Sequence, residues 1–158
     1  MENIKDIAIQ VIDTEANSIL GLKNLLTDNF AKVVELILKS KGNVVVSGIG
    51  KSANIAQKIV ATLNSTGTTA VFMHAADAIH GDLGIIRDDD IVIIISKSGE
   101  TPEIKVLTPL IKIRKNKLVA IVGNTKSYLA AEADYVLDTT VPHEACPNNL
   151  APTASTPA

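Results

Sequence analysis

The run DIVIIIS at residues 90–96 constrains the fold most, because it is short, continuous and built almost entirely of isoleucine and valine. Such a run is typical of a strand that is buried on both faces, as in parallel sheets covered by helices on each side. Further short strands are predicted within 43–50, 69–73, 117–123 and 134–139. Strands that alternate with helices indicate βαβ units. The sequence therefore predicts an α/β fold, a three-layer sandwich around a doubly wound and mainly five-stranded parallel sheet.

Helical patterns lie before and between these strands. Apolar residues recur at helical spacing in the N-terminal part of the chain, and Pro102 suits the first turn of a later helix. Helices are expected over 4–26, 29–39, 51–67, after Pro102 and over 126–133. The polar segment 74–86 is expected to hold one or two helical turns.

The composition is that of a globular protein, with 46% apolar and 20% charged residues in a chain of 158. The net charge is −2 without a basic stripe, which argues against nucleic acid as the partner. The single cysteine, Cys146, excludes an intramolecular disulfide, and we expect a small buried residue rather than a nucleophile. No apolar run approaches the ~20 residues that span a bilayer, and no signal peptide is visible. A cytoplasmic protein without membrane contact is expected.

The end of the sequence predicts one domain over 1–158 that lacks its last helix or helices. A doubly wound domain usually closes with a helix, and the chain stops where Thr153 or Ser155 would cap another one. The alternative is a ragged natural terminus.

The loop SGIGKS at 47–52 resembles a nucleotide-binding turn but does not fit one. A P-loop requires its first glycine at position 45, which is Val45. A dinucleotide fingerprint would place Ala53 at its third glycine and needs an acid near position 73, which is Met73. A smaller phosphate group remains the better interpretation.

A second loop, SKSGET at 96–101, supports that interpretation. Ser96, Ser98 and Thr101 offer hydroxyl groups at the start of a predicted helix, whose amides favour an anion. Both loops follow strands, so they should lie at the same edge of the sheet. The alternative is that Ser98 or Thr101 only caps the helix.

Four segments together resemble a known family. GIGKS at 48–52, HGDLG at 80–84, ISKSGE at 95–100 and PHEACPNNLAPTAST at 142–156 are similar to the sugar isomerase (SIS) domain. Within that family, the combination resembles the arabinose-5-phosphate isomerases of 3-deoxy-manno-octulosonate (Kdo) synthesis. The resemblance implies a flavodoxin-like fold, a sugar phosphate as ligand, no cofactor, and a homo-oligomer (dimer or tetramer) with active sites between subunits.

The same resemblance implies the interconversion of D-ribulose 5-phosphate and D-arabinose 5-phosphate through an enediol, for lipopolysaccharide or capsule. A non-catalytic SIS sensor or regulator is the alternative, and an isomerase or lyase for a hexose phosphate is a third. Relatives also carry a ring-opening histidine on a later helix and a pair of CBS domains. This sequence contains neither, so we expect the core of the isomerase domain.

Five residues match the phosphate-binding positions of the family. These are Ser52, Ser96, Ser98 and Thr101, together with the backbone amide of Lys97. Relatives often carry asparagine or glutamine at position 97. We expect the lysine side chain to point to solvent, with a charge beside the phosphate as the alternative.

Four further residues match active-site positions, namely Lys51, His80, Glu103 and Glu144. Moving a proton between C1 and C2 needs a base and a group that stabilises the enediolate. Glu144 is expected to be the base, and a carboxylate whose pKa is raised by burial would suit that role. In the simpler alternative, Lys51 is a solvated lysine and the helix dipole alone favours Glu103.

No metal site is expected. His80 with Asp77 or Asp82 is a candidate for an inhibitory metal contact, but a single histidine near carboxylates predicts a site poorly. His80 would otherwise bond a backbone carbonyl, and His74 and His143 are weaker candidates.

Overall fold

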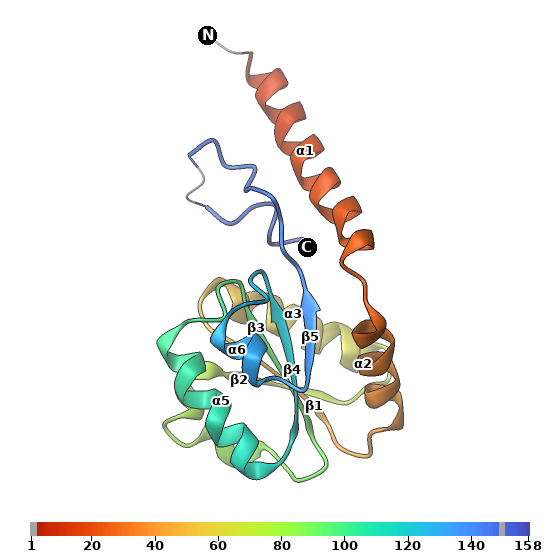
Figure 1. The fold of residues 1–158 in the computed structure, drawn as a ribbon, viewed down its shortest axis with the longest axis vertical. Helices are drawn as coiled ribbons and strands as arrows, with labels where there is room; N and C mark the ends of the chain where they lie inside the picture. The colour runs from red at the N-terminus through yellow and green to blue at the C-terminus, as the bar shows by residue number, and fades with distance from the viewer. Residues whose placement is uncertain (1–2, 149–150) are drawn as a thin grey trace.

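The computed structural model describes residues 3–148 and 151–158. Its centre is a five-stranded sheet in the order β2-β1-β3-β4-β5, and every neighbouring pair is parallel. The strands are β1 (Val44–Gly48), β2 (Ala70–His74), β3 (Ile91–Ser96), β4 (Lys117–Val122) and β5 (Tyr135–Asp138). The predicted parallel α/β fold is therefore confirmed (Figure 1).

The helical elements surround this sheet, and most lie close to their predicted ranges. They are α1 (Ile4–Gly21), η1 (Leu22–Asn24), α2 (Asp28–Lys39), α3 (Lys51–Ser65), α4 (Ala75–Ala78), η2 (Asp82–Ile85), α5 (Pro102–Arg114) and α6 (Tyr128–Glu132). Two of them, η1 and η2, are 3₁₀ helices.

The alternation of side chains along β1 shows the three layers. Val45 packs in a core with Ile104 and Leu107 of α5, whereas Val44 packs on the other face with Val33 of α2 and Ala56 of α3. Successive strand residues point to opposite faces, so a continuous apolar strand needs helices on both sides.

The N-terminal helix ends earlier than predicted. α1 stops at Gly21, and the next residues form the 3₁₀ helix η1. α2 starts separately at Asp28, where the Thr27 hydroxyl caps it by accepting a bond from the Asn29 amide at 3.3 Å. α1 extends well beyond the sheet (Figure 1), and its apolar Ile12 is 64% exposed. Among the residues described, no helix is both long and apolar enough to cross a membrane.

The strand order creates a switch point between β1 and β3. From β1 the chain passes through α3 to β2 on one side, while β3 pairs with β1 on the other. In open α/β sheets of this order, ligands bind beyond the carboxyl ends of the strands at this point. Both loops singled out in the sequence leave the sheet here.

Candidate active site

The loop after β1 presents a helix N-terminus without a side-chain cap. Gly50 precedes α3 with a φ of 57°, and no side chain caps the first turn. Gly48 has no room for a side chain, because an added Cβ would lie 2.9 Å from the carbonyl carbon of Ser52. The chain therefore turns tightly, and the first amides of α3 remain available to an anion.

The loop after β3 is shaped by its own hydroxyl groups. The Ser96 hydroxyl accepts a bond from the Gly99 amide at 3.1 Å, and the Ser98 hydroxyl accepts one from the Glu100 amide at 3.2 Å. Gly99 has a φ of 65°. Thr101 occupies the N-cap position of α5, yet its side chain makes no capping bond. The simpler interpretation, in which Ser98 or Thr101 caps the helix, is wrong.

A cavity of about 380 Å³ lies between the two loops. Its lining contains every residue that the sequence predicted for the phosphate: Ser52, Ser96, Lys97, Ser98 and Thr101, together with Ile49 and Gly123. Hydroxyl groups and helix N-termini are typical ligands of a phosphate monoester. The sequence spacing and the strand order thus bring the five residues to one place.

A larger cavity of about 660 Å³ adjoins the first and shares Ser52 and Lys97 with it. Its lining also includes the predicted catalytic residue Lys51, and Ser155 from the C-terminal segment. Much of the remaining lining is apolar, with Ile55, Ile95 and Ile121 among its members. A ligand that spans both cavities would meet hydroxyl groups at one end and two lysines nearby.

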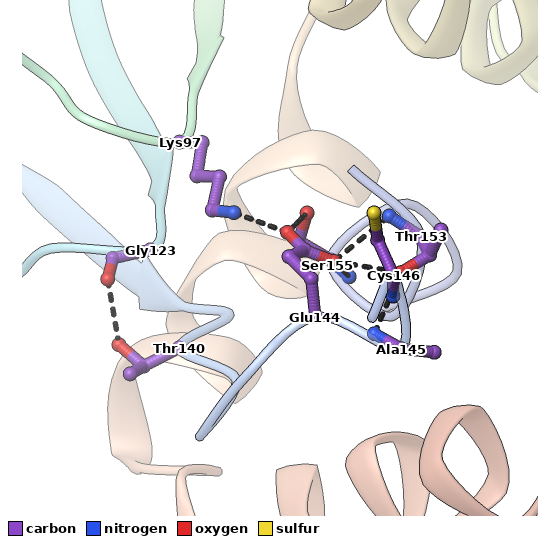
Figure 2. Close-up of polar contacts among 8 residues, drawn as sticks. All are labelled: Lys97, Gly123, Thr140, Glu144, Ala145, Cys146, Thr153 and Ser155. Carbon is purple, nitrogen blue, oxygen red and sulfur yellow. Dashed lines mark hydrogen bonds and ion pairs between the residues drawn. The ribbon is translucent and has the colours of Figure 1, made fainter. Parts of the chain in front are cut away.

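Glu144 lies in the segment that follows β5, and its side chain is only 4% exposed. Lys97 Nζ donates a bond to Glu144 Oε1, as does the Ser155 hydroxyl. The amides of Thr153 and Ser155 donate to Oε2 at 2.8 and 3.1 Å. Figure 2 shows Lys97 reaching this carboxylate from the sheet side and Thr153 and Ser155 from the chain end.

These contacts decide the charge of the carboxyl group. Burial raises the pKa of Glu144, but the hydrogen bonds from Lys97, the Ser155 hydroxyl and the two amides outweigh it. Together they hold the pKa of Glu144 well below the usual glutamate range. The expected rise in the pKa of Glu144 is therefore wrong, because burial here comes with hydrogen-bond donors.

Acid should destabilise the wild-type protein more than a Glu144→Gln variant. A carboxyl whose pKa falls on folding contributes stability above its unfolded pKa, and that contribution is lost as the pH falls toward the folded value. Urea denaturation from neutral pH down to about pH 3 would measure this difference. A parallel loss of unfolding free energy in both proteins would contradict the lowered pKa.

The structure also corrects one expectation at this site. Lys97 does not point away into solvent, because the buried Glu144 carboxylate attracts its ammonium. The further helix that Thr153 or Ser155 would cap stays a prediction, and residues 151–158 form turns. The Thr153 hydroxyl accepts bonds from the amides of Ala145 and Cys146, at 2.7 and 3.3 Å. Thr153 and Ser155 both belong to the sequence motif at 142–156, but the motif did not indicate that both would donate hydrogen bonds to Glu144.

Three predicted catalytic residues line neither cavity, namely Glu144, Glu103 and His80. Glu144 contacts Lys97 and Ser155, which both line the larger cavity. Glu103 is half-buried in the first turn of α5, and His80 is exposed in the turn after α4. Within the described residues, no group of three or more potential metal-ligating side chains is close enough to hold an ion. His74 Nδ1 lies 3.6 Å from an Asp77 carboxylate oxygen. Cys146 is half-buried rather than fully buried.

Comparison with known proteins agrees with this architecture. The SIS domain family matches residues 36–158. The chain belongs to the SIS domain family. A solved structure of an Escherichia coli CFT073 protein in complex with arabinose 5-phosphate is 36% identical, with a TM-score of 0.92, and the match covers 99% of this chain and 85% of that one.

Several curated relatives of this SIS domain are named arabinose 5-phosphate isomerase. Arabinose 5-phosphate isomerase of Pseudomonas aeruginosa is 48% identical over 94% of this chain, and that of Escherichia coli K12 is 45% identical over 93%. In both cases the match covers 46% of the relative. The chain thus spans less than half the length of these relatives.

Proposed function

We propose that this SIS domain interconverts D-ribulose 5-phosphate and D-arabinose 5-phosphate through an enediol. The observation that carries the proposal is the convergence of five predicted phosphate residues on one cavity, beside the ion pair of Lys97 with the buried Glu144 carboxylate. Relatives named arabinose 5-phosphate isomerase, and a structural relative bound to arabinose 5-phosphate, support this choice of sugar phosphate.

The small cavity would hold the phosphate end of the sugar. Hydroxyl groups of Ser52, Ser96, Ser98 and Thr101 line it, and the start of α3 adds amides and a positive dipole. The phosphate then fixes the position of the sugar chain, which extends toward the larger cavity. Such anchoring brings the carbon that loses its proton close to the base.

Glu144 would act as the base for the proton that moves between C1 and C2. Lys51 lines the larger cavity and would stabilise negative charge on the enediolate oxygen. We assign no cofactor to this reaction. The proton removed from one carbon is replaced by a proton on the neighbouring carbon, so the isomerisation needs no oxidant or reductant.

A second copy of the chain would complete the site. Glu103 and His80 match catalytic positions of the family yet lie outside both cavities. Apolar side chains on the first two helices are exposed, including Ile12 and Leu38 at 64% and 77%, and such surfaces favour association. We therefore propose a cytoplasmic homo-oligomer that serves Kdo synthesis.

An exchange experiment in deuterated water would test the function. Ribulose 5-phosphate should give arabinose 5-phosphate with deuterium at C2, which proton NMR detects as a lost C2 signal. Glucose 6-phosphate under the same conditions tests preference for a hexose phosphate. Binding of both without exchange or conversion would favour a non-catalytic sensor and overturn the isomerase proposal.

A further inference from the structure

Lys97 connects the two cavities of the candidate site. It lines the small cavity and the large one, and its ammonium pairs with Glu144. The Lys97 side chain is 55% exposed, whereas the Glu144 side chain is 4% exposed. The carboxylate is therefore fixed by its surroundings, and the lysine is the partner with room to move.

The small cavity contains no other fixed charge among the described residues that line it. Its remaining polar groups are hydroxyls, and a phosphate monoester carries about −1.5 to −2 charges at neutral pH. A doubly charged phosphate attracts an ammonium group more strongly than a single carboxylate does at the same distance. Bound phosphate would thus compete with Glu144 for Lys97.

Glu144 can lose this ammonium and remain hydrogen-bonded. The amides of Thr153 and Ser155 and both of their hydroxyls donate to the carboxylate. When the ammonium leaves, these four donors still hydrogen-bond to the carboxylate, although its charged partner is lost. The other charged residues that line the large cavity are Lys51 and Asp138.

The backbone of Lys97 is held at Gly123. Its carbonyl oxygen accepts a bond from the Gly123 amide at 3.0 Å, and a Cβ added at Gly123 would lie 3.3 Å from Lys97 Cγ. Because Lys97 lines both cavities, the inference requires only its outer side chain to move.

We propose that Lys97 is a phosphate-responsive positioning residue, whose ammonium leaves Glu144 for the bound phosphate, so that Glu144 Oε1 loses its charged partner while it keeps the Ser155 hydroxyl. This inference rests on the proposed function and adds a trigger to it, namely that bound phosphate activates Glu144 as a base. Loss of the ammonium raises the pKa of Glu144 toward the range of a useful base. The base would then become effective only when a phosphate is bound.

Inorganic phosphate, without any sugar, is the probe that tests this trigger. The ¹³C signal of the Glu144 carboxyl carbon, assigned by its absence in Glu144→Gln, should shift when phosphate saturates the wild-type protein. The shift should be lost in Lys97→Met, which should also bind phosphate about tenfold more weakly. Lys97→Arg should restore the shift, because it keeps the charge. Lys112→Met removes a lysine of similar exposure from its pair with Glu132 and should leave the shift unchanged.

The outcomes separate this inference from the function on which it rests. Phosphate that binds, by ³¹P NMR, without moving the Glu144 signal overturns the trigger alone. An equal shift in Lys97→Met does the same. Phosphate that fails to bind the wild-type protein at all overturns both the trigger and the proposed phosphate site.

Discussion

Glu144→Gln should abolish isomerisation without weakening phosphate binding. Glutamine fills the same space and offers an oxygen to the amides of Thr153 and Ser155, but it does not transfer protons at neutral pH. Loss of a general base typically lowers the rate by about 10²–10⁴-fold. The fall should appear in kcat, because the phosphate cavity does not include Glu144.

Deuterium exchange into the sugar phosphate measures the catalytic loss, and a ³¹P titration measures binding. Glu132→Gln is a matched control, since Glu132 also pairs with a lysine but lies on the exposed surface of α6. Its kinetics should match those of the wild type. Equal loss of exchange and of phosphate binding in Glu144→Gln would mean that the carboxylate has a structural role only.

Gly99→Ala should remove phosphate binding and destabilise the fold. Gly99 has a φ of 65°, and an added Cβ would lie 2.0 Å from the Ser127 hydroxyl oxygen and 2.5 Å from its Cβ. Ser127 caps α6 by accepting a bond from the Ala130 amide at 3.3 Å. Backbone strain and the lost cap together should lower the free energy of unfolding by about 2–4 kcal/mol.

Urea denaturation and a phosphate titration measure the two effects of Gly99→Ala. Gly67→Ala is the control for backbone strain alone, because Gly67 has a φ of 93° and nothing within 4 Å of an added Cβ. That variant should lose stability but bind phosphate normally. Adding Ser127→Gly to Gly99→Ala removes both colliding atoms and should restore part of the phosphate affinity. Normal binding in Gly99→Ala itself would show that the loop 96–101 does not hold the phosphate.

The sheet and the meeting of the two loops at one cavity were predictable because both depend on local patterns. Short β-branched runs such as residues 90–96 define buried strands. Parallel strands end at one edge, so loops that follow them meet there. Ser52 and Ser98 are far apart in the sequence, yet this rule alone places them in the same cavity.

The environment of Glu144 was not predictable in the same way. A carboxyl expected to be buried can have its pKa raised or lowered, depending on how many donors surround it. The donors come from Lys97 and from Thr153 and Ser155, which no periodic pattern connects to Glu144. Because no pattern connects Lys97 to Glu144, the sequence also led us to expect that the Lys97 side chain faces solvent.

The segment after β5 has a further consequence for how such a site evolves. Among the described residues, the amides of Ala145 and Cys146 bond to the Thr153 hydroxyl and those of Thr153 and Ser155 bond to the Glu144 carboxylate, whereas the sheet keeps its own separate ladder of bonds. A substitution at Pro152, which lines the larger cavity, would therefore change the cavity wall without removing these bonds. We expect mutational tolerance to be higher at Pro152 than at Glu144 and Thr153, so that the wall of the larger cavity diverges while the two loops at 47–52 and 96–101 are retained.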